Sequence, residues 1–435
     1  MDYFFSLLTT GRIKLKSNSM SEQFVPPIFD VPTLWTADML YPFLLKSVFN
    51  ITDIQVSDKD KEMLRSLRNN KLIYFSNHPT HAEPAIAFRV ANIMGSRFNY
   101  MATRHVFNWG SGAIGHFIKR LGAFSVLAGA NDRDSIKMAR SILSSQKGKL
   151  VIYPEGMTDG ENDNLLPFMP GAIQIGFWGY EDAKKLDSNT DIIILPSFVK
   201  YTINGSSEWI QNELSNSIAR IENALSFDPG NRNLLRRYLA IGKVLLEKAE
   251  KDYSIKETSS NDYEYRIGRV RHAILDSVAN RYNIKNYDKS KDAISKIRHL
   301  FTVIESIEAG FPSKDLEGLS KRELAEAKKE VQKAYDFIVV KREYLLSYPS
   351  PERFFEWLVR FESIVFGKSE NRSRTARVLF AKPFGLSEYY NKYKENKKAT
   401  VEELTLRLRN DLEKLMREGI RFTSPIVQPN DVGND

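Results

Sequence analysis

The sequence contains no cysteine among its 435 residues. Disulfide bonds, thiolate metal sites and a cysteine nucleophile are therefore excluded, and the composition fits a reducing compartment. Long hydrophobic runs are absent too: no stretch of about 18 apolar residues occurs, so no membrane-spanning helix is predicted. Histidine is scarce. His272 and His299 have no acidic cluster at ligand spacing beside them, so no metal site is expected.

The remaining composition is that of a folded protein. Hydrophobic residues make up 42% of the chain and aromatic residues 11%, enough for the cores of two or three domains and too many for a disordered chain. The formal net charge of +9 would attract anionic lipid headgroups or anionic substrates, although a solvated lysine-rich surface would give the same number. No recognition-module motif is present, so nucleic acid is not an expected partner.

The stretch Lys71 to Ala87 combines a strand, a polar corner and a helix start. Leu72 to Phe75 are apolar, a polar corner runs from Ser76 to His81, and a helix is predicted from Glu83. Open α/β sheets place their chemistry at such a junction. His78 could take a proton from a hydroxyl, and a carboxylate on its other ring nitrogen would hold the required tautomer. Alternatively, Glu83 only complements the helix dipole.

A second strand ends in a similar way. The segment Leu150 to Tyr153 is apolar and runs directly into a Pro-Glu-Gly sequence at residues 154–156. Between and after these two segments, strand patterns alternate with helix patterns, and this alternation predicts a largely parallel sheet covered by helices. We therefore expect an α/β fold with a mixed, mostly parallel sheet.

The two strand ends together resemble the glycerolipid acyltransferase family, which includes lysophosphatidate acyltransferases. The first motif of that family is Asn-His, four further residues and an acid, and Asn77, His78 and Glu83 match it. The usual acid is Asp, so Glu83 is longer by one methylene. The third motif is an apolar strand followed by Pro-Glu-Gly. Segments 166–172 and 195–198 resemble the parts of the family that follow it.

Two positions depart from the family pattern. The second motif usually carries an arginine that grips the phosphate of the acceptor, and Ala128 stands there in this chain. The third motif is often followed by Thr-Arg, whereas Met157 and Thr158 follow it here. Both expected arginines are missing. Either the acceptor is not a simple glycerol phosphate, or other cations bind it, and the nearby candidates are Arg104, Lys119, Arg120 and Arg133.

The pattern predicts five regions along the chain. Residues 1–50 form an N-terminal extension, whose helix at Leu34 to Phe49 either contacts a membrane or packs on the core, while Tyr3 to Leu8 could lie in a membrane interface or be loose. Residues 51–205 form the acyltransferase core. Residues 206–374 read as a large all-α helical insertion, residues 375–420 return to the core with a strand and a closing helix, and residues 421–435 are expected to be a loose tail.

The resemblance implies transfer of a fatty acyl group from a thioester, on coenzyme A or acyl carrier protein, to a hydroxyl of a glycerol phosphate, lysophospholipid or related lipid. His78 would be the general base and Glu83 would orient it, whereas the rival base His81 has Ile86, not an acid, five residues on. The other expected substrate-binding residues are Asn77, Pro154, Glu155 and Gly156. No tightly bound cofactor is implied, and the protein is expected on the cytoplasmic face of a membrane, peripherally bound. The alternative is a catalytically weak membrane-surface or carrier-docking protein on the same scaffold.

Overall fold

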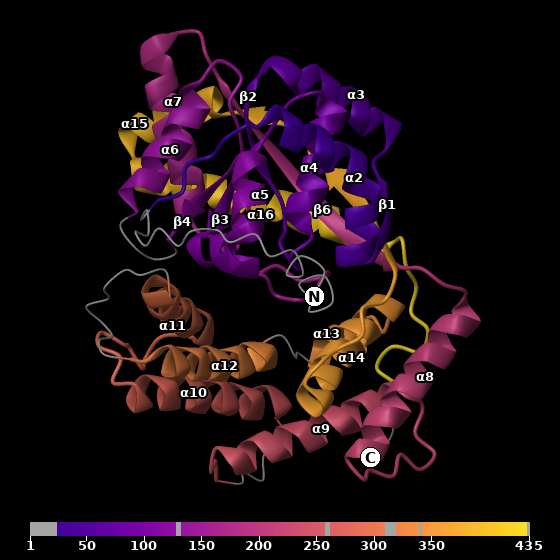
Figure 1. The fold of residues 1–435 in the computed structure, drawn as a ribbon. Helices are drawn as coiled ribbons and strands as arrows, with labels where there is room; N and C mark the ends of the chain where they lie inside the picture. Colours follow the sequence, from indigo (N-terminus) through magenta and orange to yellow (C-terminus); the bar gives the residue numbers. More distant parts are fainter. Residues whose placement is uncertain (1–23, 128–131, 257–261, 309–318, 339–341, 433–435) are drawn as a thin grey trace. The chain divides into compact units, whose positions relative to one another are not determined.

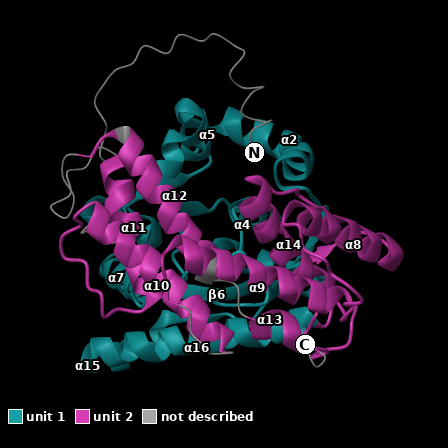
Figure 2. Ribbon diagram, turned by 90° about the horizontal axis from the view of Figure 1, so that it is seen from below, with its two compact units in different colours: residues 1–201, 373–420 teal, residues 202–372, 421–435 magenta. Residues whose placement is uncertain are grey.

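The computed structural model describes residues 24–127, 132–256, 262–308, 319–338 and 342–432. The N-terminal cluster at Tyr3 to Leu8 and the position of Ala128 lie outside these ranges. The chain forms two compact units, which Figure 2 colours separately. Unit 1 combines Met1–Tyr201 with Ser373–Ile420, and unit 2 combines Thr202–Arg372 with Arg421–Asp435.

Unit 1 is built on a sheet flanked by helices (Figure 1). The described residues form eight strands, in the order β1-β7-β6-β2-β5-β3-β4, with β8 paired to β6. The strands are β1 (Ile51–Gln55), β2 (Lys71–Phe75), β3 (Asn99–Thr103), β4 (Ala123–Val126), β5 (Lys149–Ile152), β6 (Ile192–Ile203), β7 (Arg374–Phe380) and β8 (Phe384–Gly385). β2 pairs in parallel with β5 and β6, β3 with β4 and β5, and β1 with β7. β8 is antiparallel to β6. The predicted mixed, mostly parallel sheet is confirmed.

Both faces of the sheet are covered, and alternation along β2 explains how. Leu72 and Tyr74 belong to the core on one face, whereas Ile73 and Phe75 belong to the core on the other. The first core is covered by α3 (Asp58–Ser66) and α4 (Glu83–Met94), and the second by α6 (Arg133–Ser144), α7 (Gly171–Leu186) and α16 (Lys397–Ile420). The other helical segments of unit 1 are α2 (Val31–Phe49), η1 (Leu67–Asn69), η2 (Arg104–Gly112), α5 (Ala113–Arg120), η3 (Leu386–Tyr389) and α15 (Tyr390–Glu395).

Three details of unit 1 were not settled by the sequence pattern. β1 was not predicted, because three of its five residues are exposed polar positions that mimic a loop. β6 is continuous through Pro196, which pairs with Phe75 and accepts a hydrogen bond from the Ala381 N–H at 3.0 Å. α2 continues through Pro42, where the packing of its neighbour Tyr41 against α4 outweighs the one lost backbone hydrogen bond.

Unit 2 is helical over the residues that the structure describes. Its helices are α8 (Ser207–Ala224), α9 (Leu234–Asp252), α10 (Tyr263–Arg281), α11 (Ala293–Glu308), α12 (Lys321–Ile338), α13 (Arg342–Ser347) and α14 (Pro351–Phe366). Apolar residues of α8, α9, α13 and α14 share one buried core, and α10, α11 and α12 pack on one another, as in a helical bundle. α12 and α13 are described on either side of residues 339–341, which lie outside the described residues.

The C-terminal tail packs on unit 2, so the prediction of a loose tail is wrong for residues 421–432. Ile426 and Val432 pack against the apolar core of the bundle, which gives this segment a reason to be ordered. The Ile426 N–H donates to the Pro349 carbonyl at 3.0 Å, and the Arg236 guanidinium donates to Asp431 at 2.6 Å.

Candidate active site

Segments far apart in the sequence converge at one edge of the unit 1 sheet. Because β2, β5 and β6 are parallel, their carboxyl ends meet at the same edge. The corner after β2 carries His78, the loop after β5 carries Glu155, and Tyr201 lies near the end of β6. The His78 N–H donates to Glu155 Oε1 at 2.9 Å, which joins the first two loops directly.

His78 and Glu83 form a hydrogen-bonded pair. His78 Nδ1 lies 2.8 Å from Glu83 Oε2. Glu83 is in the first turn of α4, and the helix can start there because Pro84 occupies a position whose N–H is not needed. The Glu83 side chain is 1% exposed, and that of His78 is 17% exposed. The carboxylate is therefore enclosed while the imidazole keeps access to a ligand.

Two further residues hold the Glu83 carboxylate. The Thr80 N–H donates to Oε2 at 3.0 Å, the Thr80 hydroxyl donates to Oε1 at 2.7 Å, and the Tyr201 hydroxyl donates to Oε1 at 2.5 Å. Burial alone would raise the pKa of Glu83, but the hydrogen bonds and charge of His78, with those of Tyr201 and Thr80, hold the pKa below its ordinary value. Glu83 is thus ionised, and His78 must present an N–H to it from Nδ1, which leaves Nε2 as the basic nitrogen.

The ring of His78 is also fixed by stacking. The Tyr153 ring, at the end of β5, lies 4.2 Å from the imidazole centroid at an interplanar angle of 18°. His81 meets His78 edge to face at 6.5 Å and Trp109 at 5.9 Å, and within the described chain it makes no hydrogen bond to an acid. His78, not His81, therefore has the geometry of an oriented base.

The Pro-Glu-Gly segment joins the loops around the site through hydrogen bonds. Glu155 is 1% exposed, and its second oxygen accepts the Leu166 N–H at 2.7 Å. Burial raises the pKa of Glu155 to about 7. The Pro154 carbonyl accepts the Met169 N–H at 2.8 Å, and Gly156 has a φ of +71° with its N–H donated to the Tyr153 carbonyl at 3.1 Å. Of the two roles open to Glu155, contact with acceptor hydroxyls or support of the loop, the structure favours the second.

Asn77 was predicted to bind substrate, but its side chain instead bonds the backbone of β6. Its side chain is buried, its amide nitrogen donates to the Val199 carbonyl at 3.1 Å, and its oxygen accepts the Val199 N–H at 2.7 Å. Asn162 also donates to the Val199 carbonyl, at 2.8 Å. These bonds fasten the corner after β2 to β6, and they occupy the groups that would have met a substrate.

The four candidate cations lie at two different edges. Arg104 directly follows β3 and Arg133 begins α6 after β4, so both are at the carboxyl edge with the His78 pair. Lys119 and Arg120 end α5 just before β4 begins, which puts them at the opposite edge. The structure does not bring Lys119 or Arg120 to the site. Their closeness to the motifs along the chain suggested otherwise. η2 and α5 recross the sheet between β3 and β4, and this crossing carries the two residues to the other edge.

Sequence reasoning missed Thr80, Tyr153, Tyr201 and Arg374. The first two adjoin the motifs and could have been found there. Tyr201 and Arg374 could not be found in this way. Arg374 follows the helical insertion in the sequence, yet its guanidinium lies 4.2 Å from the centroid of the Tyr201 ring. That contact, with the Ala381 N–H bonded to the Pro196 carbonyl, shows that β7 runs antiparallel to β6 and starts at the edge of the site.

An imidazole held by a buried acid, at the carboxyl edge of a helix-covered, mostly parallel sheet, has the arrangement that general-base chemistry requires. Residues 55–200 match the family model described as Acyltransferase, and this part of the chain is therefore an acyltransferase domain. The resemblance to glycerolipid acyltransferases is confirmed at the level of the family. A search of curated proteins found no match to the chain.

Two further findings bear on the site. In the part of the chain that the structure describes, no group of three or more His, Asp or Glu side chains is placed to hold a metal ion. Among the described helices, none is both long enough and apolar enough to cross a membrane.

Proposed function

We propose that the protein transfers a fatty acyl group from an acyl thioester to a hydroxyl of a glycerol phosphate, a lysophospholipid or a related lipid acceptor. The donor thiol is that of coenzyme A or of acyl carrier protein. The observation that carries the proposal is the 2.8 Å contact of His78 Nδ1 with the buried, ionised Glu83. This contact leaves Nε2 of a partly exposed histidine as a base inside an acyltransferase domain.

The reaction follows from the groups at this edge. His78 Nε2 takes the proton of the acceptor hydroxyl, and Glu83 stabilises the imidazolium through Nδ1–H. The acceptor oxygen attacks the thioester carbonyl, the tetrahedral intermediate collapses to an ester, and the departing thiolate receives the proton from His78. No acyl-enzyme intermediate is formed. The hydrogen bond from the backbone N–H of His78 to Glu155 keeps the imidazole ring in place during both proton transfers.

The test compares wild type, His78→Ala and His81→Ala with a radiolabelled acyl donor and a panel of lysolipids and glycerol phosphate. We expect His78→Ala to lose at least a hundredfold in kcat, within the range of general-base catalysis of about 10²–10⁴. His81→Ala, the matched control, should retain most of its rate. Equal activity of His78→Ala and wild type would refute the base assignment, and transfer by none of the three would favour the weakly active binding protein.

Peripheral contact with a membrane is part of the same proposal. Trp35, Met39 and Phe43 lie at four-residue intervals on α2, so they share one face, and they are 71%, 74% and 64% exposed. α2 packs on α4, which carries Glu83: the Tyr41 hydroxyl donates to the Ala85 carbonyl at 2.9 Å. An apolar helix face one helix away from the dyad would let a lipid acceptor reach His78 from a bilayer.

Vesicle sedimentation tests this contact. Trp35→Glu/Phe43→Glu should bind phosphatidylglycerol vesicles at least tenfold more weakly than wild type. The control Ile364→Glu/Leu406→Glu changes two exposed apolar residues elsewhere and should bind as wild type does. If the two double variants bind alike, α2 is not the membrane contact.

A further inference from the structure

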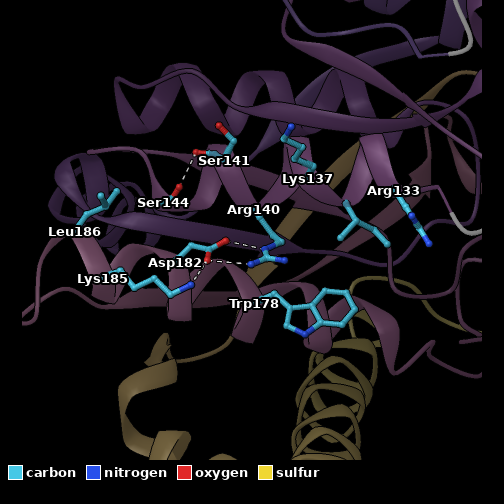
Figure 3. Close-up of a pocket in the computed structure, with 10 residues that line it drawn as sticks. Arg133, Lys137, Arg140, Ser141, Ser144, Trp178, Asp182, Lys185 and Leu186 are labelled. Carbon is cyan, nitrogen blue, oxygen red and sulfur yellow. Dashed lines mark hydrogen bonds and ion pairs between the residues drawn. The ribbon is translucent and has the colours of Figure 1, made fainter.

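Unit 1 has a groove between α6 and α7, with a volume of about 650 Å³, that the site does not use (Figure 3). The helices pack closely along their length, and both start at the carboxyl edge of the sheet, after β4 and β5, and run towards the opposite edge. Arg133, the first residue of α6, lines one end of the groove, and Leu186, the last residue of α7, lines the other. The groove is thus as long as α6, about 18 Å for its 12 residues.

The lining of the groove is cationic. Its ten lining residues include four cations, Arg133, Lys137, Arg140 and Lys185, and one acid, Asp182, which gives a net charge of 4 − 1 = +3. Arg140 donates to Asp182 with two nitrogens, at 2.7 and 2.9 Å, and Lys185 donates to it at 3.0 Å. Hydrogen bonds from Arg140 hold the pKa of Asp182 below its ordinary value. One carboxylate is therefore hydrogen-bonded to two of the cations. The other two, Arg133 and Lys137, are exposed to solvent.

Apolar groups accompany these charges. Leu186 is 77% exposed, and Ile136 and Trp178 are half-buried. A groove lined by both apolar side chains and cations suits an amphipathic helix with an acidic face, because such a helix presents both kinds of group at i, i+3 and i+4 spacing. A small anion would use the cations but would leave the apolar side chains in water.

The groove also begins at the same edge of the sheet as the corner that carries His78. β2, which leads to His78, and β4, which leads to α6, are three strand spacings apart in the sheet, about 14 Å. A protein docked along α6 and α7 would sit within reach of the dyad for a thioester carried on a long flexible arm. Docking there would leave the corner with His78 uncovered.

We propose that the groove between α6 and α7 binds an acidic amphipathic helix of the carrier protein that delivers the acyl thioester. This inference rests on the proposed function and adds the partner to it: the donor is a protein-bound thioester, recognised through Lys137, Lys185 and the apolar residues of the lining. Complementary charge mainly speeds association, so the effect appears in kcat/KM and falls with ionic strength.

The test uses the full chain and two donors, hexadecanoyl-acyl carrier protein and hexadecanoyl-coenzyme A, with lysophosphatidate in detergent micelles as acceptor. The variant Lys137→Glu/Lys185→Glu reverses two groove charges. The matched control Lys59→Glu/Arg65→Glu makes the same change of charge on exposed positions of α3. Binding of unloaded acyl carrier protein to each variant is measured separately by calorimetry at low and high salt.

We expect the groove variant to lose at least tenfold in kcat/KM with the protein-bound donor, to stay within twofold of wild type with the coenzyme A donor, and to bind the carrier at least tenfold more weakly. The control variant should match wild type throughout. A groove variant that matches wild type with both donors, or loses equally with both, overturns the inference. So does a loss confined to binding of phosphatidylglycerol vesicles, which would make the groove a lipid-headgroup contact.

The two proposals fail in different ways. Transfer from coenzyme A alone, with no binding of the carrier to wild type, removes the docking inference and leaves the proposed function in place. Tight carrier binding that depends on Lys137 and Lys185, with no transfer from either donor, removes the proposed function and leaves the docking inference in place.

Discussion

Replacing Glu83 by aspartate, the acid usual at this position of the family motif, should make the protein slower and less stable. The Glu83 carboxylate meets His78 Nδ1 at 2.8 Å, and Thr80 and Tyr201 donate three more hydrogen bonds at 2.5 to 3.0 Å. Removing one methylene withdraws the carboxylate by about 1.5 Å, a carbon–carbon bond length. The distance to Nδ1 would become about 4 Å, which is beyond a hydrogen bond.

The size of the effect follows from these contacts. A hydrogen bond to a charged group contributes about 1.5–3 kcal/mol, and Glu83→Asp gives up the bond to His78 and strains those from Tyr201 and Thr80. We expect the free energy of unfolding to fall by about 2–4 kcal/mol. Loss of the acid that orients His78 should lower kcat about a hundredfold, which corresponds to about 2.7 kcal/mol in the barrier.

The assay is steady-state acyl transfer, together with urea unfolding of the same samples. Glu62→Asp, on the exposed side of α3, removes the same methylene away from the site and should change neither quantity. If Glu83→Asp keeps kcat within threefold of wild type, the reach of the carboxylate does not orient the base, and the reasoning from the 2.8 Å contact fails.

Three further predictions concern neighbouring contacts. Tyr201→Phe removes the hydroxyl bonded to Glu83 and should lower kcat about tenfold and stability by about 1–3 kcal/mol, measured by transfer assay and urea unfolding; unchanged values would mean that Thr80 and His78 suffice. Burial raises the pKa of Glu155 from an ordinary 4.5 to about 7, so the folded state binds the proton more tightly and wild-type stability should fall as the pH rises from 4.5 to 7, by up to about 3 kcal/mol. Urea unfolding of Glu155→Gln at a series of pH values should lack this slope, and a slope equal to that of wild type would point to another group. Asp163 pairs with Lys200, and both side chains are fully buried, so Asp163→Asn should cost about 3–5 kcal/mol in unfolding free energy by leaving the ammonium without its partner; a cost under about 1 kcal/mol would contradict this.

Local sequence patterns predicted much of the fold and the centre of the site. The apolar runs at β2, β5 and β6 and the helical stripes of residues 206–374 were readable because each depends on neighbours within one strand or a few helical turns. His78 with Glu83 was readable for the same reason, since five residues span one corner. β1 was not, because an edge strand with exposed polar positions lacks the alternation that marks a buried strand.

What the sequence by itself determined are thus the elements and the residue types at their ends: a histidine and an acid after one apolar strand, and a glutamate after another. Only the tertiary structure decided which of these groups meet. It brought Tyr201 beside Glu83 and Arg374 over the Tyr201 ring, turned Asn77 and Glu155 into supports for the corner, and put Lys119 and Arg120 at the far edge of the sheet. The physical reason is that strand order and direction arise from burying both faces of the sheet at once, and no local stretch of sequence contains that condition.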